Sequence, residues 1–168
     1  LRYGARLAAE GVPIVTVPKT MDNDVFGTDM CIGFSTAVTR SVEAITALRT
    51  TASSHERVLV VELFGRRSGE TALLAGLLAD ADRTLIAEVA VDPVRLATLV
   101  AADHAANPSR YAVVVVSEGA KLTGGGEIEY GEPDPYGRRK LGGIGEVLSD
   151  EIKARTGLDT IVQRLAYM

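Results

Sequence analysis

The stretch Arg57-Val-Leu-Val-Val-Glu-Leu-Phe-Gly-Arg-Arg-Ser-Gly-Glu70 decides the fold. Its first seven residues form a mostly apolar, β-branched run, which is typical of a strand buried on both faces. Gly65 ends this run, and the Ala- and Leu-rich segment from about 69 to 80 is predicted to be a helix. A buried strand that turns directly into a helix is the repeating unit of an α/β protein with a parallel sheet.

The same alternation of strand and helix extends outward in both directions. Further strands are expected over residues 14–17, 84–89, 111–117 and 160–165. Further helices are expected up to about residue 9 and over residues 34–50, 93–106 and 144–156. We therefore predict a three-layer α/β fold, in which a mainly parallel, Rossmann-like sheet carries helices on both faces.

The length of 168 residues favours one domain that spans residues 1–168. The connection from 119 to 140 is long and polar and contains Gly124-Gly-Gly126, so we expect it to be mobile in part. Leu1 falls inside a helical pattern, and Met168 directly follows a strand-like run. We therefore expect the chain to be a piece of a larger protein.

The composition excludes several classes of protein. With a net charge of −4 and basic residues scattered among acidic ones, a non-specific nucleic-acid surface is not expected. The single cysteine, Cys31, excludes a disulfide framework, and His55 and His104 have no partner at a metal-binding spacing. No apolar run reaches the roughly 18 residues that a membrane-spanning helix needs, so a cytoplasmic protein is expected.

A polar loop follows the strand expected at residues 14–17. It reads Pro18-Lys-Thr-Met-Asp-Asn-Asp24. Ligands of open α/β sheets bind outside the carboxyl ends of the strands, so this loop is placed to hold a phosphorylated substrate. Asp22 and Asp24 could serve as a base and as a metal-associated carboxylate in phosphoryl transfer. Spacing alone favours the alternative, an Asx-rich turn that caps the next helix.

Two more strand ends carry polar groups of a compatible kind. In the quoted stretch, Gly65 permits close backbone approach, and Arg66 or Arg67 can contact a phosphate. Alternatively, the arginines cover the end of the helix and Glu70 is part of its cap. Glu88 follows the next strand and could accept hydrogen bonds from sugar hydroxyls. Three successive strand ends of this kind favour a binding site over scattered surface polarity.

These motifs resemble those of the 6-phosphofructokinase family. Four segments occur in the order and spacing of that family: Pro18-Lys-Thr-Met-Asp-Asn-Asp24, Ser53-Ser-His-Glu-Arg57, Glu62-Leu-Phe-Gly-Arg-Arg-Ser-Gly69 and Leu85-Ile-Ala-Glu88. The resemblance covers nearly the whole chain and assigns it to the middle of such an enzyme, without the N-terminal donor loops and the C-terminal part. One departure is Ala87, which replaces the usual proline.

The resemblance implies phosphoryl transfer to the C1 hydroxyl of fructose 6-phosphate, giving fructose 1,6-bisphosphate in glycolysis, with Mg²⁺ present. Asp22 matches the general base, and Thr20 lies beside it at the transferred phosphoryl group. Arg66 matches the arginine that stabilises charge during the transfer. Asp24 matches the second acidic residue, which is associated with the magnesium and phosphate environment.

The resemblance also implies how the sugar phosphate is held. Phe64 and Gly65 match sugar contacts, and Glu88 matches the carboxylate that holds sugar hydroxyls. Arg57 matches an arginine that reaches the 6-phosphate in a neighbouring subunit's site, which implies a homo-oligomer. Tyr167 falls where relatives have histidine or tyrosine just before a Gln-Arg-Gly-Gly type segment, whose arginine also binds the 6-phosphate.

The phosphoryl donor is left open between ATP and pyrophosphate. Lys19 is similar to the lysine of the pyrophosphate-using branch, which favours pyrophosphate slightly. The decisive donor-loop residues precede Leu1, so the 168 residues alone are expected to be inactive. Two alternatives stay open: a non-catalytic sugar-phosphate binding or regulatory module of the same fold, and another small-molecule kinase.

Overall fold

The structure is a computed structural model that describes residues 1–133, 135, 137 and 139–166. Its centre is a four-stranded parallel sheet. In spatial order the strands are β2 (Arg83–Leu85), β3 (Ala112–Ser117), β1 (Val58–Leu63) and β6 (Thr160–Leu165). Because all four strands run the same way, their carboxyl ends lie along one edge of the sheet.

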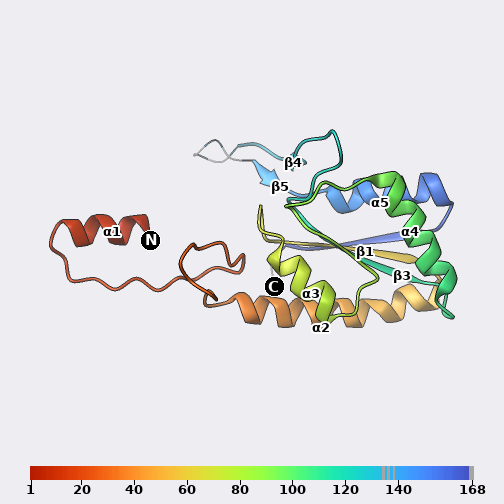
Figure 1. Cartoon of the computed structure of the whole chain (residues 1–168), viewed down its shortest axis with the longest axis horizontal. Helices are drawn as coiled ribbons and strands as arrows, with labels where there is room; N and C mark the ends of the chain where they lie inside the picture. Colours follow the sequence, from red (N-terminus) through yellow and green to blue (C-terminus); the bar gives the residue numbers. More distant parts are fainter. Residues whose placement is uncertain (134, 136, 138, 167–168) are drawn as a thin grey trace.

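Helices cover both faces of this sheet (Figure 1). One face packs against α2 (Phe34–Ser54) and α3 (Glu70–Leu78), and the other packs against α4 (Pro93–Ala106) and α5 (Ile144–Thr156). The predicted three-layer α/β fold with a mainly parallel sheet is therefore confirmed.

The two central strands are apolar because both of their faces are buried. Along β1, Val58 and Val60 point toward α4 and α5, while Leu59 and Val61 point toward α2 and α3. This alternation follows from the two-residue period of a strand. It explains why both central strands read as continuous apolar runs rather than as an alternating pattern.

One predicted strand is wrong. Residues 14–17 run in an extended course, but no strand of the described residues pairs with them. Val15 is 89% exposed and Val17 is 62% exposed. A β-strand needs a hydrogen-bonded neighbour, and a β-branched sequence alone does not provide one. Only an isolated bridge, between Lys19 and Ile32, forms where this segment meets the body.

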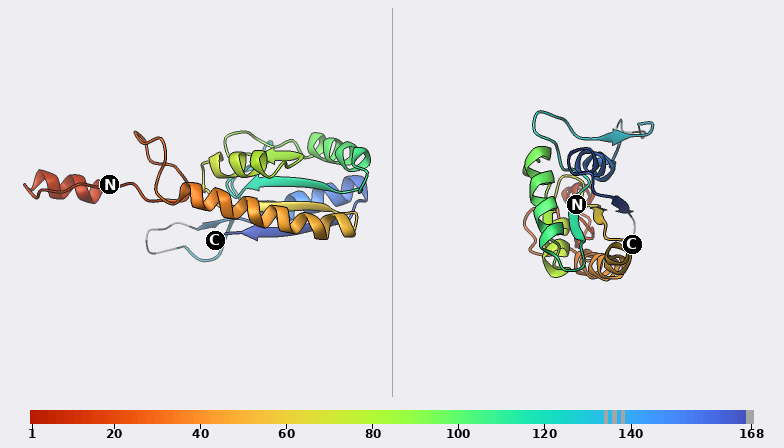
Figure 2. Two further views of the ribbon diagram at one scale, coloured as in Figure 1. Left: turned by 90° about the horizontal axis from the view of Figure 1, so that it is seen from below. Right: turned by 90° about the vertical axis from the view of Figure 1, so that its right-hand side faces the viewer.

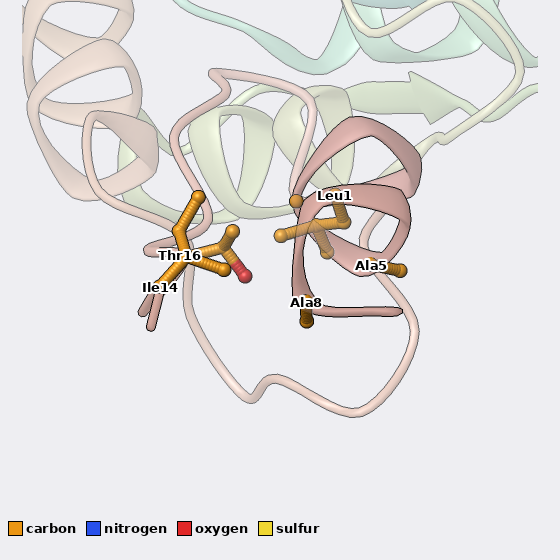
Figure 3. A pocket seen from close by; sticks show the side chains of 6 residues that line it. Leu1, Ala5, Ala8, Ile14 and Thr16 are labelled. Carbon is orange, nitrogen blue, oxygen red and sulfur yellow. The ribbon is translucent and has the colours of Figure 1, made fainter. Parts of the chain in front are cut away.

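The first 17 residues extend from the body as an arm (Figure 2). The arm begins with α1 (Arg2–Ala9), and its extended part folds back along this helix. The two parts meet where Gly4 lies against Thr16, because a β-carbon at Gly4 would collide with the threonine methyl group. Beside this contact is a cavity of about 260 Å³, lined in part by Leu1 and Ile14 (Figure 3).

One other boundary differs from the sequence prediction. The strand expected at 84–89 is the short β2, which ends at Leu85, so Glu88 lies three residues beyond it. Within the long connection after β3, β4 (Glu129–Tyr130) pairs antiparallel with β5 (Lys140–Leu141). None of the described helices is both long enough and apolar enough to cross a membrane.

Candidate active site

The loop of residues 18–31, here called the Asp22 loop, is held at its base and against α3. Thr20 donates its backbone N–H to the Ile32 carbonyl at 3.2 Å, and the Thr20 hydroxyl accepts from the backbone N–H of Asp22 at 3.1 Å. At the next residue, the Thr71 hydroxyl of α3 donates to the Met21 carbonyl at 3.3 Å. The Asp22 loop therefore lies against the start of α3, at the carboxyl edge of the sheet (Figure 1).

The turn of residues 64–69, here called the Arg66 turn, leaves β1 in a conformation that needs glycine. Gly65 has a φ of 138°, and a β-carbon there would lie 2.6 Å from the Ser68 carbonyl oxygen. Arg66 itself has a left-handed φ of 50°. Its carbonyl oxygen lies so close to Gly119 that a β-carbon at position 119 would collide with it. The backbone here is specified by glycines rather than by side-chain packing.

Asp22 lies in an electrostatic environment suited to a base. Its carboxyl is partly buried, and this burial raises the pKa above its usual range. The neighbouring carboxylate of Asp24 raises the pKa further, whereas the guanidinium of Arg66 lowers it. The structure thus brings together three of the residues singled out in the sequence: Asp22, Asp24 and Arg66.

Glu118 belongs to this group, although sequence reasoning did not select it. One of its oxygens accepts from the Arg66 backbone N–H at 2.9 Å. Burial raises the pKa of Glu118, the hydrogen bonds from the N–H groups of Arg66 and Gly65 lower it, and the charge of Asp22 raises it. Its position in the sequence could have identified it, because Glu118 directly follows the central strand β3.

Glu88 and Arg67 are engaged in contacts of their own. One oxygen of Glu88 accepts from the backbone N–H of Gly69 at 2.9 Å, so this carboxylate anchors the start of α3. Arg67 forms two hydrogen bonds to Glu127, at 2.9 and 3.0 Å. By contrast, no hydrogen bond or ion pair joins the Arg66 guanidinium to another residue in the described part of the chain. Of the two arginines, Arg66 is therefore the one whose guanidinium is available to a ligand.

The remaining candidates are spread over the sheet. Phe64 is buried in the body, with 4% of its surface exposed, and Lys19 is exposed on the Asp22 loop. Arg57 precedes the first residue of β1, so it lies at the opposite edge of the sheet from Arg66. Tyr167 lies outside the described residues.

The Asp22 loop offers carboxylates but not a complete metal site. No group of three or more His, Cys, Asp or Glu side chains in the described residues could hold a metal ion. Asp22 and Asp24 are two oxygen-donor side chains, and the charge of Asp24 is close enough to raise the pKa of Asp22. Mg²⁺ is commonly held by one or two carboxylates together with substrate phosphates, and two carboxylates are enough for that mode of binding.

A second cavity, of about 400 Å³, lies beside the edge strand β2 and the start of α4. Its lining includes Leu85, Val91 and Leu96, and it does not include Asp22, Asp24 or Arg66. The cavity at α1 does not include them either. The group around Asp22 is therefore separate from both of these cavities.

Comparison with known proteins assigns the chain to a family. A family model described as Phosphofructokinase matches residues 1–168. The ATP-dependent 6-phosphofructokinase 3 of Streptomyces coelicolor is 42% identical over 158 residues, which cover 94% of this chain and 46% of that protein. The pyrophosphate–fructose 6-phosphate 1-phosphotransferase of Amycolatopsis methanolica is 44% identical over 162 residues, which cover 95% of this chain and 47% of that protein.

A solved structure agrees with the fold. The crystal structure of a pyrophosphate-dependent phosphofructokinase from Marinobacter aquaeolei superposes with a TM-score of 0.74 at 22% identity, covering 98% of this chain and 40% of that one. The chain thus spans less than half the length of the curated relatives named above. Because the family model matches every residue from 1 to 168, the chain belongs to the phosphofructokinase family.

Proposed function

We propose that the protein transfers a phosphoryl group to the C1 hydroxyl of fructose 6-phosphate and forms fructose 1,6-bisphosphate, a step of glycolysis. The observation that carries this proposal is the grouping of a partly buried Asp22 of raised pKa with the Arg66 guanidinium, in a member of the phosphofructokinase family. The names of the two curated relatives support the acceptor, because one is a 6-phosphofructokinase and the other is a fructose 6-phosphate 1-phosphotransferase.

In this proposal Asp22 is the general base. The C1 oxygen attacks the terminal phosphorus of the donor, and a new O–P bond forms while the bond from phosphorus to the donor's bridging oxygen breaks. The hydroxyl proton passes to the Asp22 carboxylate, and the leaving group is ADP or inorganic phosphate. Arg66 offsets the negative charge on the transferred phosphoryl oxygens, since its guanidinium is unpaired within the described chain.

The other residues bind and orient the reacting groups. The Thr20 hydroxyl accepts from the Asp22 backbone N–H, and the same group can donate to a phosphoryl oxygen. Phe64, Gly65 and Glu88 are proposed to contact the sugar, together with Tyr167. Glu118 joins them, because its carboxylate lies at the Arg66 turn on the same sheet edge.

Mg²⁺ is proposed as the cofactor, with Asp24 as the residue that helps to hold it. When bound, the ion would neutralise charge on the donor phosphates. The described residues supply a pair of carboxylates and no larger cluster, which fits an ion that is also held by donor phosphates and water.

Neither donor is favoured by the comparisons, because ATP-dependent and pyrophosphate-dependent enzymes match with similar identity. Because of Lys19, we propose pyrophosphate as the donor slightly in preference to ATP. Its exposed ammonium on the Asp22 loop can contact a small, densely charged donor.

The test is a parallel assay of the natural full-length protein on fructose 6-phosphate with ATP and with pyrophosphate. We expect turnover with one donor, and we expect Asp22→Asn to lower kcat by roughly 10²- to 10⁴-fold, the usual contribution of a positioned base. Binding of fructose 6-phosphate without turnover by either donor would favour the non-catalytic module. Turnover with a different acceptor would favour another small-molecule kinase.

A further inference from the structure

The side-chain amide of Asn23 has a partner for each of its polar groups. Its oxygen accepts from the backbone N–H of Cys31 at 2.8 Å. Its nitrogen lies 3.1 Å from both carboxylate oxygens of Glu70 and 3.2 Å from the Asp29 carbonyl oxygen. Rotating the amide by half a turn would bring its oxygen against three acceptors, so its orientation is determined by these contacts.

Glu70 is oriented toward this amide rather than toward its own helix. The N-cap of α3 is Gly69, which has no side chain that could cap the helix. The carboxylate of Glu70, in the first turn, instead accepts from Asn23, a residue 47 positions earlier in the chain. The contact therefore joins two segments that are distant in sequence.

The contact lies where it can set the geometry of the site. Asn23 stands between Asp22 and Asp24 and has a left-handed φ of 51°, so Glu70 holds the loop at a residue adjacent to both carboxylates. Glu70 directly follows the Arg66 turn. One short segment thus carries Arg66 and, four residues later, holds the loop that carries Asp22.

We propose that Asn23 and Glu70 are a positioning pair that fixes the Asp22 carboxyl relative to the Arg66 guanidinium. Neither residue needs to touch a substrate for this role. The inference rests on the proposed function for its effect on turnover, whereas the ordering of the Asp22 loop by the pair can be measured without any substrate.

Asn23→Asp is the most informative single change. Aspartate has the shape of asparagine and also tolerates a left-handed φ, so the backbone is not strained. Its second carboxylate oxygen, however, would face the Glu70 carboxylate at the position where an N–H group now donates. We expect a 10- to 100-fold loss of kcat, the order of effect that about 1 Å of misplacement can cause, with a much smaller change of KM for the sugar phosphate.

Glu70→Gln supplies the matching rescue. In the double variant Asn23→Asp with Glu70→Gln, the glutamine amide can donate to the new carboxylate, and the total charge of the pair is the same as in the natural protein. We expect the double variant to recover at least 10-fold of the lost kcat. Glu70→Gln alone should cost about 3-fold, because a charge-assisted hydrogen bond becomes a neutral one.

The control is Glu43→Gln, which removes the same charge from an exposed ion pair with Arg40 on α2 and should leave kcat unchanged. The second readout is hydrogen exchange of the Cys31 backbone amide in the full-length protein without substrate. We expect exchange to be at least 10-fold faster in Asn23→Asp and to slow again in the double variant.

The outcomes separate the two proposals. Loss and rescue in both readouts support the positioning pair. If Asn23→Asp has natural kcat, or if the double variant is as impaired as the single one, the positioning pair is overturned. If the natural protein itself transfers nothing to fructose 6-phosphate, the proposed function fails, and the exchange of the Cys31 amide alone then decides whether Asn23 and Glu70 order the loop.

Discussion

The pKa of Asp22 is influenced by one negatively charged neighbour and one positively charged neighbour. Burial and the carboxylate of Asp24 raise its pKa, and the guanidinium of Arg66 lowers it. A general base must be deprotonated to act, so kcat/KM should fall on the acid side as Asp22 takes up its proton. The position of this acid limb reports the sum of the three effects.

Two substitutions should move the acid limb in opposite directions. Asp24→Asn removes a like charge, which lowers the pKa of Asp22 and extends activity to lower pH. Arg66→Gln removes the cation, which raises the pKa of Asp22 and moves the limb to higher pH, in addition to a loss of turnover. The measurement is kcat/KM of the full-length protein between about pH 5 and 9.

Arg67→Gln is the matched control for this pair. It removes a cation from the same turn, but Arg67 is engaged by Glu127 and is not among the groups that shift the pKa of Asp22. The limb should therefore stay in place. Shifts of the same sign for Asp24→Asn and Arg66→Gln would show that Asp22 is not the titrating base.

Strand-end positions in the sequence made Asp22 and either Arg66 or Arg67 candidates, and the family resemblance was needed to choose Asp22 and Arg66. Sequence positions did not predict that Asn23 would bind Glu70 or that Glu118 would bind the Arg66 backbone. These two side chains act through partners 47 and 52 positions away, and no local pattern records such a pairing. Both contacts depend on the folded arrangement of segments that are distant in the sequence.

At the scale of elements, the end of β1 is joined to its neighbours by a buried carboxylate. Glu62 is 4% exposed. It accepts from the backbone N–H groups of Gly143 at 3.0 Å and Gly145 at 2.8 Å, where α5 begins. Arg164 of β6 donates to it at 3.2 Å. One side chain thus ties the central strand to a helix start and to the adjacent strand.

Glu62→Ala should therefore be among the most destabilising single changes. It would leave two backbone N–H groups without their acceptor, at a cost of about 1–3 kcal/mol for each donor. It would also remove the nearer of the two carboxylates that pair with Arg164, whose other partner is Glu146. The measurement is the free energy of unfolding in urea. Glu43→Ala, which breaks an exposed pair, should cost at most about 1 kcal/mol. Equal costs for the two changes would mean that the Glu62 contacts add nothing to stability.

The strands show where pattern reading succeeds and fails. Residues 57–63 and 14–17 are both rich in β-branched side chains, yet only the first segment is a strand in the structure. The two segments differ in whether a neighbouring strand is present to pair with them. β1 has β3 on one side and β6 on the other, whereas residues 14–17 have no strand beside them in the described chain. Composition indicates that a segment suits a sheet, but not that a sheet is there to receive it.

At the scale of the whole molecule, the sheet separates Arg57 from the group around Asp22. Arg57 precedes β1 and Arg66 follows it, and a six-residue strand is roughly 20 Å long. Arg57 therefore lies too far from Arg66 to share a ligand with it in one chain. This distance agrees with the expectation from the family resemblance, and we propose that Arg57 contributes to a site in a neighbouring subunit.

Mixed oligomers test that sharing. Arg57→Ala and Asp22→Asn should each be inactive alone, but a mixed dimer would contain one site with both natural residues. Random mixing of equal amounts should recover roughly a quarter of natural activity, since half of the dimers are mixed and half of their sites are complete. The measurement is turnover after the two variants are co-expressed. A mixture as inactive as its parts would confine Arg57 to its own subunit.

The order of the strands also bears on how the chain is made. β1 ends at Leu63, but its neighbour β6 ends only at Leu165. A ribosome that adds 5–20 residues per second needs roughly 5–20 s for the intervening stretch of about 100 residues. During that interval one edge of an apolar strand has no partner from its own chain. The nascent protein therefore passes through a stage that is open to pairing with other chains, and binding by a chaperone is of most use to it then.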